Sequence, residues 1–343
     1  MTPPTPTCGL LLLGAADCRQ IAGRAAHAEA VGLDHVWIPD ERFYRDPYLV
    51  SAQIAALTVR VTVGPCVTDP YMRNPAVTAA AVATLDEISD GRAVLGIGAG
   101  GSGFSELGVE RTPGPVEAVE AAVATVRRLL AGERTGTGAG FGFRARRARI
   151  PVHVAAEGPQ MLRLAGRIGD GVVIQGRTDP ALIAAATTEV LAGAAEAGRD
   201  RDDLTVTTRI DVALATSRDA AVAALRPSCV RRLHNAHRRR QLARHGFSIP
   251  ASLTDAIESA GYTHDPGTLA ALGALVPDDV LDAVSLAATP ADLGERLDRL
   301  VDAGIDHVLV NPVAGDGTEA GEELVNQLGT WRTGRAGSGE GTA

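Results

Sequence analysis

The chain has 343 residues, 45% hydrophobic and 22% charged, a composition typical of a globular protein with a large apolar core. Its 33 basic and 41 acidic side chains give a formal net charge of −8, so nucleic acid is not expected as a partner. The cysteines show no CxxC or paired spacing, which indicates neither a zinc site nor a disulfide framework, and we expect no bound metal. The dense apolar run at residues 10–13 is too short for a signal sequence or a membrane span, so we expect a cytoplasmic protein with no membrane partner.

Apolar runs suited to buried strands alternate with helix-forming stretches along the chain. The predicted strands cover residues 9–13, 35–38, 59–66, 93–97, 152–155, 172–174, 204–214 and 307–311. The predicted helices begin near Cys18, Pro47, Ala76, Val116, Pro159, Pro180, Ser217 and Pro290, and a short last helix covers residues 319–331. Eight strands alternating with helices, without an obvious domain linker, predict a closed (β/α)8 barrel. We expect one domain over residues 1–333, followed by a disordered tail at 334–343.

One segment departs from this repeat. Residues 227–288 are mostly helical in pattern and precede the eighth predicted strand, so we predict a helical insertion there. A segment of this length is expected to carry function or to cover another part of the protein.

The segment GRAVLGIGAGGSG, residues 91–103, combines a short apolar strand with a glycine-rich exit. Glycines let the backbone turn sharply and let a ligand approach the N–H groups closely, which favours a site for a phosphate-bearing cofactor. The same pattern is equally typical of a plain strand-to-helix connection. A dinucleotide-binding fingerprint is disfavoured, because residues 104–115 separate the glycines from the next predicted helix.

Polar segments follow several of the predicted strands directly. They are residues 40–46, 68–74, 98–102, 157–160 and 175–178. In a (β/α)8 barrel the loops after the strands meet on one face, and active sites are built from them. The sequence therefore predicts a site at the carboxyl ends of the strands.

The motifs VWIPDERFYRD, VTVGPCVTDPYMRNPAVTAAAVATLDEISDGRAVLGIGAG and SELGVERTPGPVEAVEAAVATVRRLLAGE resemble the luciferase-like flavin- and deazaflavin-dependent oxidoreductases. They are most similar to the branch of F420-dependent methylenetetrahydromethanopterin reductases. The segments VHVAAEGPQMLRLAGRIGDGVVIQG and TPADLGERLDRLVDAGIDHVLVNP continue the resemblance, which covers most of the chain.

The resemblance implies a set of site residues. A non-prolyl cis peptide, Cys66-Val67, is expected to lie against the back of the cofactor ring, with Thr68 and Asp69 beside it. The other residues expected at the cofactor are Gly98, Ala99 and Gly100 at the ring, Glu157, Gly158, Pro159 and Gln160 at the phosphate, and Gln175 and Gly176, which complete that pocket. A helix N-terminus at 158–160 suits a phosphate, because its N–H groups and dipole favour an anion.

Asp40 and Glu41 are the candidate catalytic residues. Asp40 is expected near the ring system, although a capping role is an alternative for it. Several members of the family carry Asp-His where this chain has Asp40-Glu41. Glu41 would act as the acid if burial raises its pKa, or it is a solvated carboxylate paired with Arg42 or Arg45.

The resemblance implies hydride transfer between C5 of the deazaflavin F420 and a C=N, C=C or carbinol carbon of a small organic substrate, in a homodimer. Two alternatives stay open: an FMN-dependent monooxygenase that uses O2, and a non-catalytic barrel that acts as a partner protein. The predicted insertion holds a basic cluster, made of Arg231, Arg232, His234, His237, Arg238, Arg239, Arg240 and Arg244. Such a run is usually a solvated helix face, but it would also attract the phosphate and the acidic tail of F420. FMN has no such tail.

Overall fold

The computed structural model describes residues 5–41, 43–101, 104, 107–313 and 319–339. Its strands are β1 (Thr7–Leu11), β2 (His35–Ile38), β3 (Thr62–Pro65), β4 (Leu95–Ile97), β5 (Val152–Ala156), β6 (Gly171–Gln175), β7 (Thr205–Leu214), β8 (Ser285–Ala288) and β9 (His307–Pro312). Its helices are α1 (Cys18–Ala30), α2 (Pro47–Leu57), α3 (Pro75–Ile88), α4 (Pro115–Leu130), α5 (Pro159–Ile168), α6 (Pro180–Glu196), α7 (Arg218–Leu233), α8 (Ala236–Arg244), α9 (Ala251–Ala260), α10 (Pro266–Gly273), α11 (Asp278–Val284), α12 (Leu293–Asp302) and α13 (Glu319–Gly339). No helix among these residues has the length and apolar character needed to cross a bilayer.

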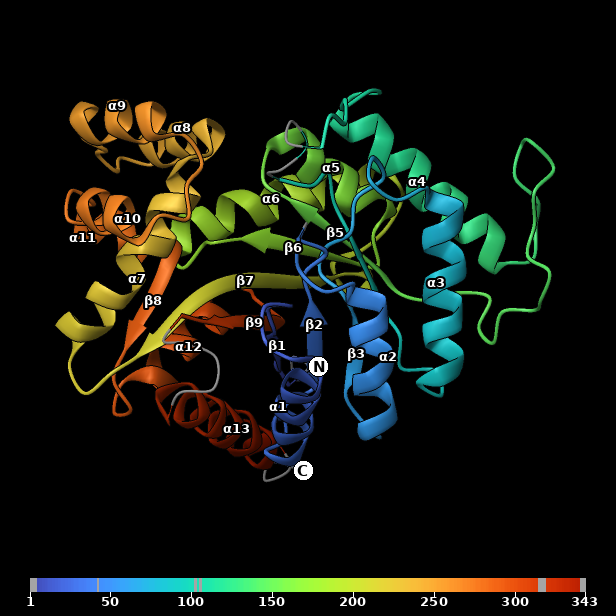
Figure 1. The fold of residues 1–343 in the computed structure, drawn as a ribbon, viewed down its shortest axis with the longest axis horizontal. Helices are drawn as coiled ribbons and strands as arrows, with labels where there is room; N and C mark the ends of the chain where they lie inside the picture. The colour runs from blue at the N-terminus through green and yellow to red at the C-terminus, as the bar shows by residue number, and fades with distance from the viewer. Residues whose placement is uncertain (1–4, 42, 102–103, 105–106, 314–318, 340–343) are drawn as a thin grey trace. The chain divides into compact units, whose positions relative to one another are not determined.

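The strands form one sheet in the order β3-β2-β1-β9-β7-β6-β5-β4 (Figure 1). Parallel bridges from Val63 to Ala93 and from Thr68 to Ile97 link the β3 segment to β4, the other end of that order. The sheet is therefore a nearly closed eight-stranded barrel, as predicted. β8 is a ninth strand outside this order and pairs in parallel with residues 211–214 of β7.

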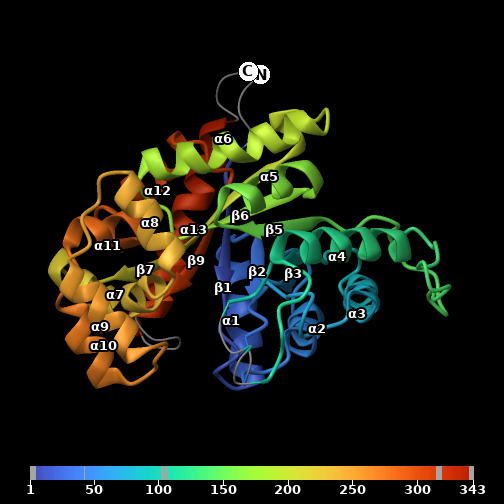
Figure 2. The same ribbon diagram turned by 90° about the horizontal axis from the view of Figure 1, so that it is seen from above.

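The chain divides into two compact units. The N-terminal unit contains residues 9–173 and 189–205, and the C-terminal unit contains residues 1–8, 174–188 and 206–343. In the N-terminal unit, α2 lies between α1 and α3, and α4 packs beside α3 (Figures 1 and 2).

Local sequence explains where the helices of the N-terminal unit begin. Asp17, Asp46 and Asn74 are the N-caps of α1, α2 and α3, and each side chain accepts a backbone N–H of the first turn. Pro47 and Pro75 follow two of these caps, at a position where the missing N–H costs no hydrogen bond. These caps fix where the chain leaves the loops that follow β2 and β3.

β3 begins later than its β-branched sequence predicts. The backbone N–H groups of Val59, Arg60 and Val61 donate to the carboxylate of Glu29, at 3.0, 2.6 and 2.7 Å. A segment whose N–H groups converge on one carboxylate cannot also pair with a neighbouring strand, so the strand starts at Thr62. The other seven barrel strands overlap their predicted segments, although β1 lies two residues earlier than predicted and β4 begins two residues later.

The predicted insertion is helical, with two corrections. α7 continues through Pro227, where the insertion was expected to begin. The last four residues of the segment form β8, which the helical pattern concealed. Helices α7–α11 surround an apolar cluster of their own, to which Leu225, Leu242 and Ile257 contribute.

The last helix is longer than predicted. α13 continues to Gly339 rather than ending at Trp331, so the part of the expected tail at 334–339 is helical. Residues 340–343 of that expected tail lie outside the described residues.

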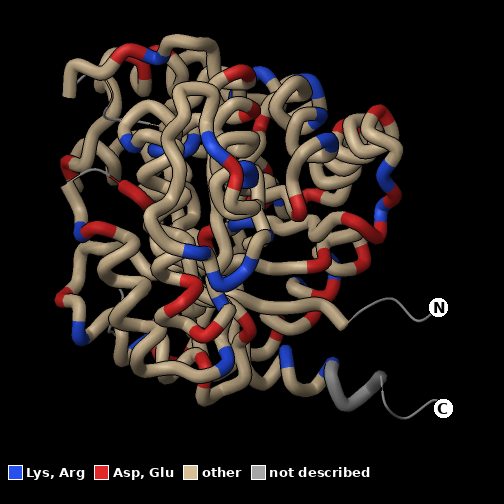
Figure 3. Tube along the Cα trace, turned by 90° about the vertical axis from the view of Figure 1, so that its right-hand side faces the viewer, with Lys and Arg blue, Asp and Glu red and all other residues tan. Residues whose placement is uncertain are grey.

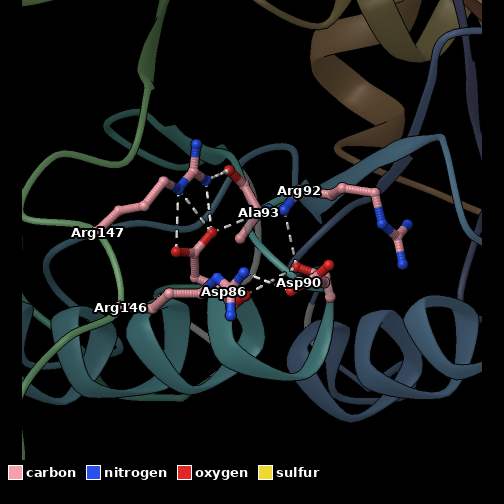
Figure 4. A network of polar contacts seen from close by, with 7 residues as sticks. Asp86, Asp90, Arg92, Ala93, Arg146 and Arg147 are labelled. Carbon is pink, nitrogen blue, oxygen red and sulfur yellow. Dashed lines mark hydrogen bonds and ion pairs between the residues drawn. The ribbon is translucent and has the colours of Figure 1, made fainter.

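Arginine supplies all the permanent positive charge of the protein, because the sequence contains no lysine. The blue segments in Figure 3 are therefore arginines, distributed among red acidic positions. Two of them anchor the irregular segment at 131–151, which contains neither helix nor strand (Figure 4). Arg147 binds both carboxylate oxygens of Asp86 near the end of α3, and Arg146 pairs with Asp90.

Candidate active site

The peptide between Cys66 and Val67, directly after β3, is cis, which confirms the expected bond. The N–H of Cys66 donates to Ile38 of β2 at 2.8 Å. Two residues on, the N–H of Thr68 donates to Gly96 of β4 at 3.0 Å. Backbone hydrogen bonds thus hold this segment between the two neighbouring strands.

Asp40 and Thr68, which follow β2 and β3, meet at the carboxyl ends of these strands. The Thr68 hydroxyl donates to Oδ2 of Asp40 at 2.7 Å, and Thr68 is fully buried. Burial raises the pKa of the Asp40 carboxyl, against the opposing effects of the Thr68 hydrogen bond and the Arg73 charge. Asp40 does not cap a helix, because the N-cap of α2 is Asp46.

Arg73 joins Asp40 to Asp46. Its Nη2 lies 2.6 Å from Oδ2 of Asp46, and its Nε lies 4.0 Å from Oδ2 of Asp40. The guanidinium carbon stacks over the ring of Tyr48, 4.7 Å from the ring centre. The sequence pattern did not identify Tyr48, whose place in an apolar helix resembles that of any core residue.

The glycine segment after β4 lies beside these residues in the N-terminal unit. A Cβ on Gly98 would lie 3.1 Å from both the Val67 and the Ala155 side chains. Gly100 has a φ of +68°, and a Cβ there would lie 2.4 Å from the Phe104 ring and 3.2 Å from the Asp69 carboxylate. Gly100 therefore needs glycine for its left-handed backbone, and close packing disfavours a larger residue at Gly98.

Asp69 and Ala99 organise the loops around the glycines. Oδ1 of Asp69 accepts the N–H groups of Tyr71 and Met72, each at 2.9 Å, so this carboxylate shapes its own loop. The carbonyl of Ala99 accepts a hydrogen bond from Nη2 of Arg111 at 3.3 Å.

An aromatic pair lies over this region. The rings of Tyr71 and Phe104 meet edge to face at 5.7 Å, and the Arg111 guanidinium lies 5.3 Å from the Phe104 ring centre. The Tyr71 hydroxyl donates to the carbonyl of Pro113, which follows a second cis peptide. Phe104 and Arg111 lie in the segment between the glycines and α4; Arg111 belongs to a motif of the family resemblance, but the sequence assigned neither residue to the site.

Glu41, the second candidate acid, has different surroundings from Asp40. Glu41 is half-buried in the loop after β2. Arg45 donates to the carbonyls of Gly14 and Ala15, at 3.0 and 2.8 Å, and Arg42 lies outside the described residues.

The N-terminus of α5 carries the predicted phosphate residues. Gly158 is its N-cap and makes no side-chain cap, Pro159 is the first residue, and Gln160 is exposed. Glu157 precedes them, half-buried. A helix end without a side-chain cap presents backbone N–H groups that suit an anion.

Gln175 and Gly176 belong to the C-terminal unit. Gly176 has a φ of +54° and donates its N–H to Arg209, while the Gln175 carbonyl accepts Nη2 of Arg238 at 3.2 Å. A Cβ on Gly176 would lie 2.7 Å from Nη1 of Arg238 and 3.0 Å from Nη1 of Arg232. These two residues thus lie against the basic cluster.

The basic cluster is not simply a solvated face. Arg232 pairs with the buried Asp211 through one edge of its guanidinium, with Nε 2.7 Å from Oδ2 and Nη2 2.5 Å from Oδ1. Burial alone would raise the pKa of Asp211, but the charges of Arg232 and Arg209 hold it well below its ordinary range. Arg238 and Arg239 are 6% and 9% exposed, and Arg239 pairs with Glu258.

Arg240 and Arg244 of the cluster are exposed, as a solvated face requires. The cluster therefore divides into arginines that hold the insertion together and arginines that face solvent. The sequence of the cluster does not reveal which arginines are buried, because their partners are carboxylates and carbonyls elsewhere in the chain.

A family model described as luciferase-like monooxygenase matches residues 4–307. The 5,10-methylenetetrahydromethanopterin reductase of Methanolobus tindarius is 33% identical over 327 residues, which cover 90% of this chain and 94% of that protein. The enzyme of the same name from Archaeoglobus fulgidus is 33% identical over 317 residues, 88% of this chain and 93% of that protein. The structure of the coenzyme F420 dependent tetrahydromethanopterin reductase from Methanopyrus kandleri matches with a TM-score of 0.81 and 26% identity, over 94% of this chain and 97% of that one. This likeness confirms the barrel fold.

Proposed function

The chain belongs to the luciferase-like monooxygenase family, and from this membership we propose that it is an F420-dependent oxidoreductase that reduces or oxidises a small organic molecule by hydride transfer. Its relatives are reductases, so it is an enzyme rather than a non-catalytic barrel. The observation that carries the proposal is the junction of the cis Cys66-Val67 segment, the Asp40–Thr68 pair and the glycine loop within one unit.

The residues present fit such a cofactor. Gly98 and Gly100 keep the loop after β4 within packing distance of the segment that carries Val67 and Asp69, where a Cβ would lie 3.1 to 3.2 Å from those two side chains. The N-terminus of α5 offers backbone N–H groups at Gly158–Gln160 for a phosphate. When bound, F420 supplies the hydride carrier, and the protein supplies orientation and proton handling.

Asp40 is the proposed proton carrier of the site. Burial favours its protonated form, so the carboxyl keeps its proton to a higher pH than an exposed aspartate does. Thr68 fixes one carboxyl oxygen through its hydroxyl, which orients the group. Glu41 has no comparable support in the structure, and we assign the proton step to Asp40.

Cofactor binding tests the proposal first. Titration of the purified protein with F420 and with FMN, followed by fluorescence, is expected to give tight binding of F420 and weak binding of FMN. The reverse preference would favour the FMN-dependent monooxygenase, and binding of neither would overturn the proposed site.

An anaerobic screen of methylene-pterins, imines, enones and secondary alcohols with bound F420 then defines the substrate. Asp40→Asn is expected to slow turnover strongly, and the neighbouring Glu41→Gln to change it little. Equal losses of turnover in the two variants would contradict the assignment of the proton step to Asp40 rather than to Glu41.

The exposed part of the basic cluster is the proposed site for the acidic tail of F420. Arg240 and Arg244 face solvent, whereas Arg238 and Arg239 are buried and stabilise the insertion. The double variant Arg240→Ala/Arg244→Ala is expected to weaken binding of tail-bearing F420 more than binding of its tail-less precursor. Equal losses would identify these arginines as a solvated surface.

We also propose that the protein forms a homodimer through α2 and α3. α2 contains no charged residue, yet Leu49 and Leu57 on it are 75% and 58% exposed. Val77 and Ile88 expose apolar surface on the adjacent α3 (Figures 1 and 2). Helices that are apolar on all sides are usually buried, and a surface without charge suits contact with its own copy.

Light scattering during size exclusion gives the mass in solution. Leu57→Glu is expected to produce monomers, whereas Leu275→Glu, a control at an exposed leucine of the C-terminal unit, is expected to leave the dimer intact. A monomeric parent protein would contradict the proposal.

A further inference from the structure

We propose that Arg73 is a positioning residue that sets the charge state of Asp40, and that Asp46 and Tyr48 hold it in place for this role. The inference rests on the proposed function, because it takes Asp40 as the group that carries a proton. The inference adds Arg73 to the site, although the contacts described above join it neither to the cis Cys66-Val67 segment nor to the glycine loop.

Three elements bring the charged groups together. Asp40 follows β2, Asp46 is the N-cap of α2, and Arg73 lies in the loop between β3 and α3. The guanidinium binds Asp46 directly at 2.6 Å and approaches Asp40 to 4.0 Å. Arg73 therefore has one close carboxylate partner and one at the limit of an ion pair.

Three contacts restrict the conformation of the Arg73 side chain and backbone. One oxygen of Asp46 caps α2 by accepting the N–H groups of Tyr48 and Leu49, at 2.9 and 3.1 Å, and the other binds Arg73. The Tyr48 ring, 8% exposed, supplies a flat face for the guanidinium. Asn74, the next residue, is fixed as the N-cap of α3.

The charged groups around Asp40 oppose one another. Asp46 and Asp69 repel its carboxylate, the Arg73 guanidinium attracts it, and burial raises the pKa of Tyr48 so that this neighbour stays neutral. Arg73 supplies the positive charge in this set. Loss of Arg73 should therefore favour the protonated carboxyl, and loss of the negative charge on Asp46 should favour the carboxylate.

Two variants test these opposite expectations. Arg73→Gln removes the cation and keeps a polar side chain of similar length. Asp46→Asn removes the anion but retains an oxygen that caps α2, because asparagine is as good an N-cap as aspartate. Arg45→Gln is the matched control, because Arg45 donates to the carbonyls of Gly14 and Ala15 rather than to Asp40.

The pKa of Asp40 is measured in the cofactor-free protein by carbon-13 NMR of labelled aspartate, with the signal assigned by its loss in Asp40→Asn. An opposite charge at this range commonly moves a carboxyl pKa by about one unit or more. We expect Arg73→Gln to raise the value by about one pH unit, Asp46→Asn to lower it by less, and Arg45→Gln to leave it unchanged. A value that does not move in Arg73→Gln, or shifts of the same sign in the two variants, would overturn the inference. If Arg73→Gln does not fold, the downward shift in Asp46→Asn decides.

The pH dependence of turnover separates this inference from the proposed function. If the kinetic profiles shift with the NMR values, both stand. If the NMR values shift and the profiles do not, Arg73 still controls Asp40, and the assignment of the proton step to Asp40 is wrong. If only the profiles shift, the inference is overturned.

Discussion

The clasp between Arg147 and Asp86 gives a sharp prediction for stability. Nε of Arg147 lies 3.0 Å from each oxygen of Asp86, and Nη2 lies 2.8 Å from the carbonyl of Ala93 at the approach to β4 (Figure 4). Asp86 is fully buried in the last turn of α3. Arg147→Gln leaves this carboxylate with the Ala93 N–H, 3.3 Å away, as its remaining contact in Figure 4.

The expected loss follows from this geometry. Breaking a buried ion pair by removing one partner costs about 3–5 kcal/mol, because the other charge stays buried without compensation. The Arg147 side chain is 33% exposed, so water reduces the effect, and we expect about 2–3 kcal/mol. The neighbouring Arg146–Asp90 pair is largely exposed, so Arg146→Gln is expected to cost less than about 1 kcal/mol.

Equilibrium urea unfolding of the parent and both variants measures these losses, with comparison of midpoints at equal slopes. The double variant Asp86→Asn/Arg147→Gln is expected to recover part of the loss, because it removes the uncompensated charge. Equal losses in Arg147→Gln and Arg146→Gln would refute the reasoning. So would a double variant less stable than Arg147→Gln alone.

Three further predictions concern the barrel and its site. Burial lowers the pKa of His35 and of His153 to about 4, below the ordinary 6.5, so the stability that these neutral rings contribute is complete above pH 6.5 and is lost as the pH falls toward 4. His153→Gln should therefore reduce the fall of the urea midpoint between pH 7 and 4.5. An unchanged dependence of the midpoint on pH would contradict this. Gly100→Ala is expected to cost more than about 1 kcal/mol and to weaken F420 binding in fluorescence titrations, whereas Gly101→Ala, which has open space for a methyl group, should be close to neutral in both; equal effects would argue against a packed loop. Thr68→Val removes the hydrogen bond to Asp40 and should raise the pKa of that carboxyl in the same NMR titration, and a downward shift would exclude the hydrogen bond as a stabiliser of the carboxylate.

Alternating apolar runs and helix-forming stretches predicted the barrel, because local sequence patterns mark the strands and helices of such a fold. The apolar runs overlap seven of the barrel strands, and the helix starts predicted near Cys18 and Pro47 are those of α1 and α2. The start of β3 was mispredicted because it depends on Glu29, thirty residues earlier, whose carboxylate takes the N–H groups of Val59 to Val61. Such long-range competition leaves no local signal.

The site was predictable where the family resemblance marks a motif, as at Cys66-Val67 and Gly98–Gly100. The supporting contacts were not: Arg73 lies in the predicted polar segment 68–74, but nothing in the sequence shows that it stacks on Tyr48, which resembles a core aromatic. The burial of several arginines in the basic cluster was not predicted, for a related reason. Its sequence shows eight cationic or titratable side chains on a helix-rich segment, but not the distant Asp211 that neutralises Arg232.

The absence of lysine governs how the protein behaves in alkaline solution. Arginine keeps its proton far above the pH at which an ammonium group loses one, and carboxylates are fully ionised there. Among the thiols, burial raises the pKa of Cys229 to about 12, so this group also stays neutral. Between about pH 8 and 10 the electrophoretic mobility of the protein, and its retention on an anion exchanger, should therefore change less than those of a lysine-rich protein. A lysine-rich protein of the same net charge would become steadily more negative over that range as its ammonium groups titrate.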